Sequence, residues 1–354
     1  MSVTIYDIAK KAKVGVGTVS RVLNNHPSVS PETRAHVLGI AQQLDYRPNA
    51  SAQRLARKKS RTITVIMPYI TNYFFVEMLR GIQDTLFKHD YDLLLYGVNH
   101  PKQIEAYLHR SLRVGHADGI LLASLDLPPE YSKAKLRDNF PLILIDRKNE
   151  HFDSISVENI SGARIATEHL LALRHTRLAM ITGNADTSPS IERSDGYRQA
   201  LAAKPGCENA GIFHPIAEYV NDGFSKEAGF EVMSTILDLP AERTPSAVFV
   251  ASDIQAIGAI HAMQERGLSC PSDMSIVSFD DIEIAQYYGL TTMHQPIATM
   301  GALATERLFE RLDAPNLDPV HKTFTPELIH RHTTAVASLG DAPVPHAPPH
   351  PAIA

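Results

Sequence analysis

The chain has 354 residues, of which 44% are hydrophobic and 21% are charged. This composition excludes collagen-like and wholly disordered chains, and the length allows two or three domains. No apolar run approaches the roughly 18 residues that a membrane-spanning helix requires, and lysines interrupt the N-terminus, so we expect neither a membrane span nor a secretory signal. Two cysteines, Cys207 and Cys270, are too few for a disulfide framework or a four-ligand zinc site, which favours a reducing cytoplasm.

Charge is distributed unevenly along the chain. Residues 1–61 contain eleven Lys and Arg against three acidic residues, a net charge of +8, whereas the remainder carries a net charge of −13. A small basic head on a larger acidic body suggests that only the head meets a polyanion. A basic surface that is only solvated, and binds no polyanion, would show the same net charge. The local residue pattern therefore has to distinguish these two interpretations.

The head reads as three helices. Thr4 and Asp7 form a variant capping box, with Asp where Glu or Gln is usual, and open a helix that continues to Ala12. A second helix is expected over residues 16–24, and a third begins with Ser30 as N-cap, followed by a proline. Two short helices joined by a tight turn and braced by a third have helix-turn-helix geometry, in which the second helix enters the major groove of DNA.

One long ordered string of residues runs through this head. It consists of Thr4-Ile5-Tyr6-Asp7-Ile8-Ala9, Val14, Thr18-Val19-Ser20-Arg21-Val22-Leu23-Asn24, Ser30-Pro31-Glu32-Thr33-Arg34 and Leu44-Asp45-Tyr46-Arg47-Pro48-Asn49. The string resembles the LacI/GalR family of transcriptional regulators, and a looser resemblance continues to about residue 335. The resemblance implies a homodimer whose heads bind double-stranded DNA at a palindromic operator.

The resemblance also implies which residues of the head contact DNA. Hydroxyl and amide groups suit phosphate oxygens, and by family analogy this role belongs to Thr4, Tyr6, Thr18, Ser20, Asn24 and Tyr46. Arg21 can bond a guanine edge through two hydrogen bonds. Val16 and Gly17 match the variable base-reading positions of the family. Here the chain departs from the pattern, because Val16 offers only an apolar contact and Gly17 only a close approach of the backbone.

Residues 49–61 are basic and rich in alanine. Composition alone favours a flexible tether, because an isolated helix of eight residues is marginal in water. The resemblance instead implies a hinge helix, capped by Asn49, that orders on DNA. In this helix Leu55 matches the wedge inserted between base steps of the minor groove, and Ala52 matches the small residue that packs against the dimer mate.

From residue 62 onward, short apolar runs alternate with amphipathic helices. Strands are expected at residues 63–67, 92–96, 120–123, 142–145, 177–182, 248–251 and 275–279, and helices at residues 74–89, 163–173, 190–203 and 254–266. Buried strands separated by helices predict parallel sheets covered on both faces, and two such sets predict two lobes. The resemblance adds a periplasmic-binding-protein-like fold in which the chain crosses between the lobes three times.

The fold class that follows is α/β, with a division into four parts. We expect an all-α helix-turn-helix head in residues 1–48, a hinge helix and linker in residues 49–61, and a two-lobed parallel-sheet body in residues 62–339. The body is expected to bind the effector and to dimerise. Residues 340–354 are rich in proline and lack periodicity, which predicts a disordered tail.

Ligands of open α/β sheets bind beyond the carboxyl ends of the strands, so polar residues that follow strands are candidates for a ligand site. By this position the candidates are Asp146, Arg147, Ser252, Asp253 and Asp280. By family analogy the candidates are Arg193, which bonds ligand hydroxyls or a carboxylate, the stacking residues Phe74, Phe75 and Phe224, and Gln295 near a lobe crossover. Carboxylates, arginine and aromatic rings together suit a sugar, which has both hydroxyls and apolar C–H faces.

Several of these residues also have a structural interpretation. Asp253 can equally be a helix N-cap, and Phe75 can belong to the core. Gln295 can be a solvated loop residue, and Arg147 can pair with a carboxylate for structural reasons. These alternatives stay open at the level of the sequence.

The sequence contains no convincing catalytic arrangement. There is no Walker loop, no nucleophile elbow and no H-E-x-x-H motif, and the 17 histidines have no metal-ligand spacing. We expect no enzyme activity, no metal and no cofactor. The expected function is a cytoplasmic repressor of a carbohydrate-use operon, controlled by a small sugar-like effector. The alternatives are a purine-type regulator whose ligand tightens DNA binding, and a transport-type sugar-binding protein, against which the basic head argues.

Overall fold

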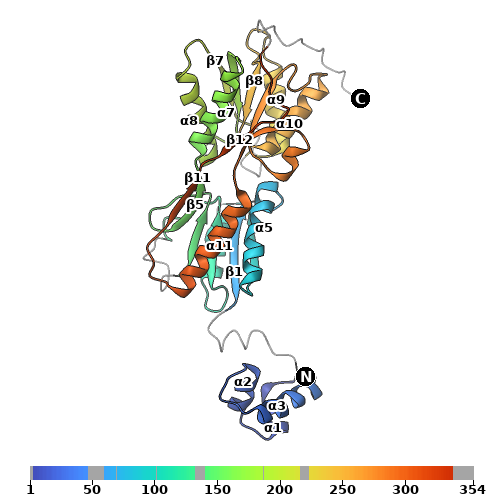
Figure 1. Cartoon of the computed structure of the whole chain (residues 1–354), viewed down its shortest axis with the longest axis vertical. Helices are drawn as coiled ribbons and strands as arrows, with labels where there is room; N and C mark the ends of the chain where they lie inside the picture. The colour runs from blue at the N-terminus through green and yellow to red at the C-terminus, as the bar shows by residue number, and fades with distance from the viewer. Residues whose placement is uncertain are drawn as a thin grey trace. The chain divides into compact units, whose positions relative to one another are not determined.

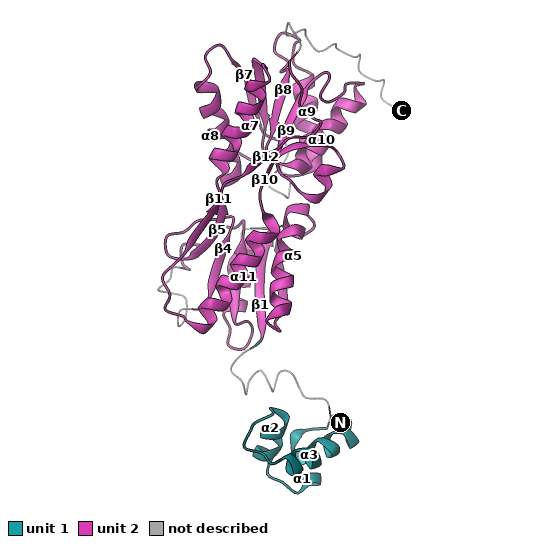
Figure 2. Ribbon diagram, in the orientation of Figure 1, with its two compact units in different colours: residues 1–60 teal, residues 61–354 magenta. Residues whose placement is uncertain are grey.

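The computed structural model describes residues 3–46, 60–68, 70–100, 102–131, 140–185, 187–215 and 223–337. The predicted hinge helix, with Asn49, Ala52 and Leu55, and the predicted tail lie outside these residues. The chain divides into two compact units, residues 1–60 and residues 61–354, which are coloured separately in Figure 2. Each unit is described by itself.

The first unit contains the three predicted helices. They are α1 (Ile5–Ala12), α2 (Val16–Leu23) and α3 (Pro31–Gln43), and their ends agree with the sequence pattern to within about one residue. The backbone amide and the hydroxyl of Thr4 donate to the Asp7 carboxylate at 2.8 and 2.7 Å, so the first turn of α1 is capped. Ile8, Val19 and Val37, one from each helix, meet in the core and are completely buried.

The second unit consists of two six-stranded sheets (Figure 1). The sheet of the first lobe contains, in spatial order, β11 (His321–Phe324), β5 (Asp153–Val157), β4 (Leu142–Ile145), β3 (Gly119–Ala123), β1 (Thr62–Pro68) and β2 (Asp92–Val98). The sheet of the second lobe contains β12 (Glu327–Ile329), β10 (Thr291–His294), β9 (Ser275–Asp280), β8 (Ala247–Val250), β6 (Arg177–Ile181) and β7 (Glu208–Phe213). All pairings are parallel except that of β10 with β12, which is antiparallel.

Helices cover both faces of each sheet, as the alternation of strands and helices predicts. In the first lobe, α5 (Tyr73–Lys88) and α11 (Ile297–Asp313) pack on one face and α6 (Lys102–Ser111) on the other. In the second lobe, α9 (Lys226–Leu237) and α10 (Asp253–Glu265) pack on one face, and α7 (Asn159–Ala172) and α8 (Ser188–Ala202) on the other. A 3-10 turn, η2 (Glu283–Gln286), follows β9.

The chain crosses between the two lobes three times. The crossings run from β5 to α7, from β10 to α11, and from β11 to β12 (Figure 1). This agrees with the crossing pattern that the family resemblance implies. The crossings leave from the carboxyl ends of β5, β10 and β11, so these strand ends lie beside the crossing segments.

Glycines allow the covering helices to pack with their backbones in contact. A Cβ atom on Gly81 of α5 would overlap the carbonyl oxygen of Ala298 in α11, and a Cβ on Gly258 of α10 would overlap the carbonyl oxygen of Lys226 in α9. Gly196 of α8 meets the carbonyl oxygen of Ile160 in α7 in the same way. Three helix pairs therefore depend on the absence of a side chain at the point of contact.

We predict that Gly81→Ala lowers the free energy of unfolding of the second unit by about 1–3 kcal/mol or more. The added Cβ forces α5 and α11 apart at their point of contact. The matched control is Gly39→Ala in α3, where a Cβ meets no atom within 4 Å. That substitution is expected to be neutral or to stabilise the helix by up to about 1 kcal/mol. Chemical denaturation of the full-length protein measures both effects, and equal stabilities for the two variants would contradict the packing argument.

Candidate functional site

A cavity lies between the two lobes, at the carboxyl ends of the strands. Its open space is about 620 Å³, including the mouth. The first lobe contributes the ends of β1, β3 and β4 and the start of α5, and the second lobe contributes the end of β9 and the starts of α8 and α10. This is the position at which open α/β sheets bind ligands.

The cavity brings together eight of the ten predicted ligand-site residues. They are Phe74, Phe75, Asp146, Arg147, Arg193, Phe224, Ser252 and Asp280. The remaining lining residues, which the sequence did not single out, are Pro68, Asn72, Ser124, Thr187, Pro189 and Ile254. Ser124 directly follows a predicted strand, so the rule that found Asp146 also points to Ser124.

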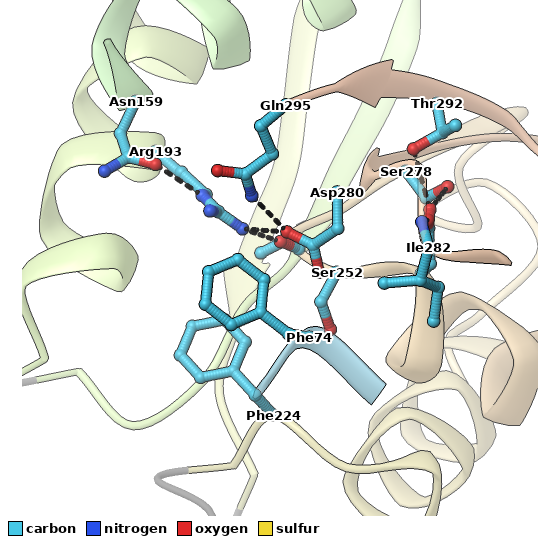
Figure 3. A network of polar contacts seen from close by, with 12 residues as sticks. Phe74, Asn159, Arg193, Phe224, Ser252, Ser278, Asp280, Ile282, Thr292 and Gln295 are labelled. Carbon is cyan, nitrogen blue, oxygen red and sulfur yellow. Dashed lines mark hydrogen bonds and ion pairs between the residues drawn. The ribbon is translucent and has the colours of Figure 1, made fainter. Parts of the chain in front are cut away.

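The centre of the site is the buried pair of Arg193 and Asp280, which are 5% and 6% exposed (Figure 3). The Arg193 Nη1 atom lies 3.5 Å from Asp280 Oδ1 and also donates to the carbonyl oxygen of Ala251. The guanidinium carbon lies 3.8 Å from the centroid of the Phe279 ring, a cation–π contact. Arg193 is thus fixed by its neighbours on several sides, and its charge is matched within the site.

Burial dominates the electrostatics of the acidic groups here. Loss of hydration raises the pKa of Asp280 above its ordinary value, although Arg193 and a hydrogen bond from Gln295 act in the opposite direction. Burial likewise raises the pKa of Asp253. Asp253 and Asp146 add to the effect at Asp280 because a like charge nearby disfavours ionisation.

The assignment of Asp253 to the ligand site has to be corrected. Asp253 is completely buried behind the cavity and accepts hydrogen bonds from the Ser278 hydroxyl (2.5 Å), the Thr292 hydroxyl (2.7 Å) and the Ile282 amide (2.9 Å). It is not the helix N-cap either, because that position belongs to Ser252. The carboxylate of Asp253 therefore holds the turn after β9 in place.

Gln295 also lies behind the cavity and does not line it. Its side chain is buried and donates from Nε2 to Asp280 Oδ1 at 2.7 Å (Figure 3). The interpretation of Gln295 as a solvated loop residue is therefore wrong, and its contact is with a lining residue.

The aromatic and polar walls of the cavity come from both lobes. Phe74 and Phe75 meet edge to face, with ring centroids 5.2 Å apart, and Phe75 belongs to the core as well as to the cavity wall. The Asn72 side chain donates to the carbonyl oxygen of Phe224 across the lobes at 3.3 Å. Figure 3 shows Phe74 and Phe224 beside the Asp280 carboxylate.

The second charged pair of the cavity lies in the first lobe. Asp146 accepts a hydrogen bond from the Ser124 hydroxyl at 2.7 Å, and its carboxylate lies 3.7 Å from Arg147. Arg147 Nε also lies 3.1 Å from Asp126 Oδ1, so Arg147 pairs with a carboxylate, as its structural interpretation proposed. It lines the cavity as well.

The first unit presents an exposed stripe on α2, which contains Gly17 and Arg21. Gly17 and Arg21 lie one helical turn apart and are exposed, whereas Val19 and Val22 face the core. A Cβ on Gly17 would meet no atom within 4 Å. Of the other residues predicted to contact DNA, Thr4 and Tyr6 are exposed, and the half-buried ones are Val16, Thr18, Ser20, Asn24 and Tyr46.

Among the residues that the structure describes, no group of three or more His, Cys, Asp or Glu side chains is arranged to hold a metal ion. Within the same residues, no helix combines the length and the apolar character needed to cross a membrane.

The raised pKa of Asp280 predicts a pH dependence of stability. The pKa in the folded state exceeds the ordinary value of 3.8, so the folded protein binds more protons between the two values. The contribution of Asp280 to stability is therefore complete below about pH 4 and is lost as the pH rises toward the folded-state pKa. We expect the free energy of unfolding to fall less steeply from pH 5 to pH 8 in Asp280→Asn than in the wild type. The control is Asp126→Asn, at an exposed position, which should fall as steeply as the wild type. Equal slopes of unfolding free energy against pH in the wild type, Asp280→Asn and Asp126→Asn would refute the prediction.

Comparison with known proteins places this architecture in a family. Residues 4–49 match the family model described as bacterial regulatory proteins, lacI family, and residues 167–334 match a periplasmic binding protein-like domain. Catabolite control protein A of Priestia megaterium is 32% identical over 326 residues, which cover 90% of this chain and 95% of the relative. The repressor PurR of Actinobacillus pleuropneumoniae is 33% identical, covering 93% and 98%. The ribose operon repressor of Escherichia coli K12 is 32% identical, with the same coverage.

Solved structures agree with these sequence comparisons. The lac repressor dimer bound to operator and an anti-inducer superposes with a TM-score of 0.81 at 26% identity, covering 95% of this chain and 100% of that one. A LacI-family regulator from Enterococcus faecium with bound ribose gives 0.68 at 25% identity, covering 78% and 100%. The regulator CelR in complex with cellobiose gives 0.67 at 26% identity, covering 94% and 99%. The chain therefore belongs to the LacI family of bacterial regulatory proteins.

Proposed function

We propose that this protein is a sequence-specific DNA-binding repressor of a carbohydrate-use operon, controlled by a small sugar-like effector. The observation that carries the proposal is the cavity between the lobes, in which the Arg193–Asp280 pair lies beside Phe74 and Phe224. Carboxylate and guanidinium groups bond hydroxyls, and aromatic rings pack on the C–H faces of a sugar. Two solved relatives hold ribose and one holds cellobiose, which supports the same class of effector.

We assign DNA binding to the first unit. The exposed stripe of α2 supports this assignment, with Arg21 available for a base edge and hydroxyl groups available for phosphates. We propose that the protein acts as a cytoplasmic homodimer on a palindromic operator, by binding and not by catalysis. The relative solved on operator DNA is a dimer, and a two-fold symmetric dimer matches a two-fold symmetric site.

A purine effector is the second candidate. PurR is among the relatives, and the phenylalanines of the cavity can stack on a purine base as well as on a sugar. In that case the ligand would tighten operator binding. The third alternative of the sequence analysis, a transport-type sugar-binding protein, is opposed by the match of residues 4–49 to the lacI family.

The DNA-binding assignment is tested through Arg21. We expect Arg21→Ala to weaken binding to the operator by about 1–3 kcal/mol, because a bidentate guanine contact is lost, and to weaken binding to a scrambled duplex much less. The operator is first selected from random duplexes, and both duplexes are measured at one salt concentration. Lys11→Ala on α1 is the charge-matched control. Equal weakening on both duplexes would mean that Arg21 contacts only phosphate.

The effector assignment is tested by a thermal-shift screen of the full-length protein with D-ribose, cellobiose, adenine and hypoxanthine. A ligand that binds only the folded state raises the melting temperature. For the compound that does so, Asp280→Ala should weaken affinity by roughly tenfold to a hundredfold, because a charge-assisted hydrogen bond is removed. Glu265→Gln, exposed on α10, is the control. A rise in melting temperature with the purines alone would favour a purine effector over a sugar. If Asp280→Ala bound the compound as tightly as the wild type, Asp280 would not belong to the effector site.

A further inference from the structure

Two buried amide side chains hold the central charged pair of the cavity, and neither of them lines the cavity. Asn159 is the first residue of α7, directly after the first crossing between the lobes. Gln295 directly follows β10, at the start of the second crossing. Figure 3 shows Asn159 bonded to Arg193 and Gln295 bonded to Asp280. Each member of the pair is thus held by a residue of a different crossing segment.

Asn159 is fixed by two hydrogen bonds that use both ends of its amide. Arg193 Nε donates to Asn159 Oδ1 at 2.9 Å, and Asn159 Nδ2 donates to Glu192 Oε2 at 2.7 Å. The residue is 6% exposed, so its amide is largely shielded from water. Because the oxygen of the amide faces the guanidinium, Asn159 sets the direction in which Arg193 extends from α8.

Gln295 holds Asp280 through its side chain and through its backbone. Its Nε2 donates to Asp280 Oδ1 at 2.7 Å, and its backbone amide donates to the Asp280 carbonyl oxygen at 3.3 Å. The other end of the amide, Oε1, is buried and accepts no hydrogen bond from any residue that the structure describes. An unmet buried acceptor is costly, which argues that this amide is retained for its contact with Asp280 rather than for stability.

These contacts leave one face of the charged pair available. The bonds from Gln295 and Arg193 both reach Oδ1 of Asp280, and the bonds of Arg193 use Nε and Nη1. Within the described part of the chain, no hydrogen bond uses Oδ2 of Asp280 or Nη2 of Arg193, and neither atom is buried without a partner, so both are open to the cavity that the two residues line. An acceptor and a donor are therefore presented together at the wall of the cavity, which suits a hydroxyl that both donates and accepts.

We propose that Asn159 and Gln295 are positioning residues for the effector, which orient Arg193 and Asp280 and tie both to the crossing segments between the lobes. The inference rests on the proposed function, because it concerns the regulation of the same cavity. A reorientation of the lobes has to bend the crossing segments, so it displaces the two amides that hold the pair. An effector that bonds Arg193 and Asp280 therefore favours the lobe orientation in which both amides reach them.

The test compares full-length variants by calorimetric titration with D-ribose, and with cellobiose and adenine where D-ribose gives no heat. Asn159→Leu and Gln295→Met keep the side-chain volume but remove the polar contact, and each is expected to weaken affinity about tenfold or more. The double variant Asn159→Asp with Glu192→Gln keeps the acceptor that faces Arg193 and supplies an amide donor in place of the lost Nδ2, so it should remain within about threefold of the wild type. Operator affinity without effector should be unchanged in all of them.

The matched control is Thr325→Val. The Thr325 hydroxyl donates to Glu158 at 3.0 Å, which joins the third crossing to the first without touching the charged pair. This variant should keep the effector affinity of the wild type. Equal loss in Thr325→Val and Asn159→Leu, or no rescue by the double variant Asn159→Asp with Glu192→Gln, would mean that only the general integrity of the crossings matters, and would overturn the proposal.

A second readout needs no effector and separates failure of this inference from failure of the proposed function. In protein labelled with 15N-arginine, the Nε–H signal of Arg193 is assigned as the one missing in Arg193→Met. We expect it to persist in the double variant Asn159→Asp with Glu192→Gln and in Thr325→Val, and to shift or broaden in Asn159→Leu. An unchanged signal in Asn159→Leu would refute the positioning role. If no compound binds the wild type but the signal behaves as expected, the effector class of the proposed function fails and the positioning of Arg193 stands.

Discussion

The organisation of the second unit depends on the three passages of the chain between its two sheets. The passages place the start of α7, the end of β10 and the β11–β12 connection together, where the carboxyl ends of both sheets meet. The cavity takes its walls from both lobes for this reason, and its central residues lie beside the connections that a movement of the lobes has to bend. A ligand that touches both walls therefore favours the orientation of the lobes in which both contacts are made.

A buried charge is tolerated only when it is paired and hydrogen-bonded, and this requirement explains the environment of the site. Arg193 lies against Asp280 and also donates to Asn159 and to the carbonyl oxygen of Ala251, and the turn that carries Asp280 is held from behind. Asp280 and Asp281 have φ angles of 117° and 58°, which are unusual for residues with side chains. Asp253 accepts the Ile282 amide, and Asp281 accepts hydrogen bonds from Arg331 (2.7 Å) and His294 (3.0 Å). These bonds maintain a strained turn that aims Asp280 at the cavity.

Sequence patterns predicted the parts of the fold in which a local signal exists. The apolar run at residues 142–145 coincides with β4, and the helices of the first unit carry recognisable caps. The strands β5, β7, β10, β11 and β12 were not predicted. β11 is polar and largely exposed, and β7 begins with two exposed polar residues, so neither shows a continuous apolar run. In the site, the position after a strand identified Asp280 and also Asp253. Which of two such carboxylates faces the cavity depends on the conformation of a turn, and the sequence alone does not contain that information.

The central claim is that the cavity and the DNA-binding unit are energetically coupled, and thermodynamic linkage tests it directly. The effector identified in the screen is titrated into the full-length protein with and without saturating operator, and the operator is titrated with and without saturating effector. The account predicts that each ligand changes the affinity of the other by the same factor, of at least about fivefold. Equal effector affinity with and without operator, in a protein that binds both, would contradict the account.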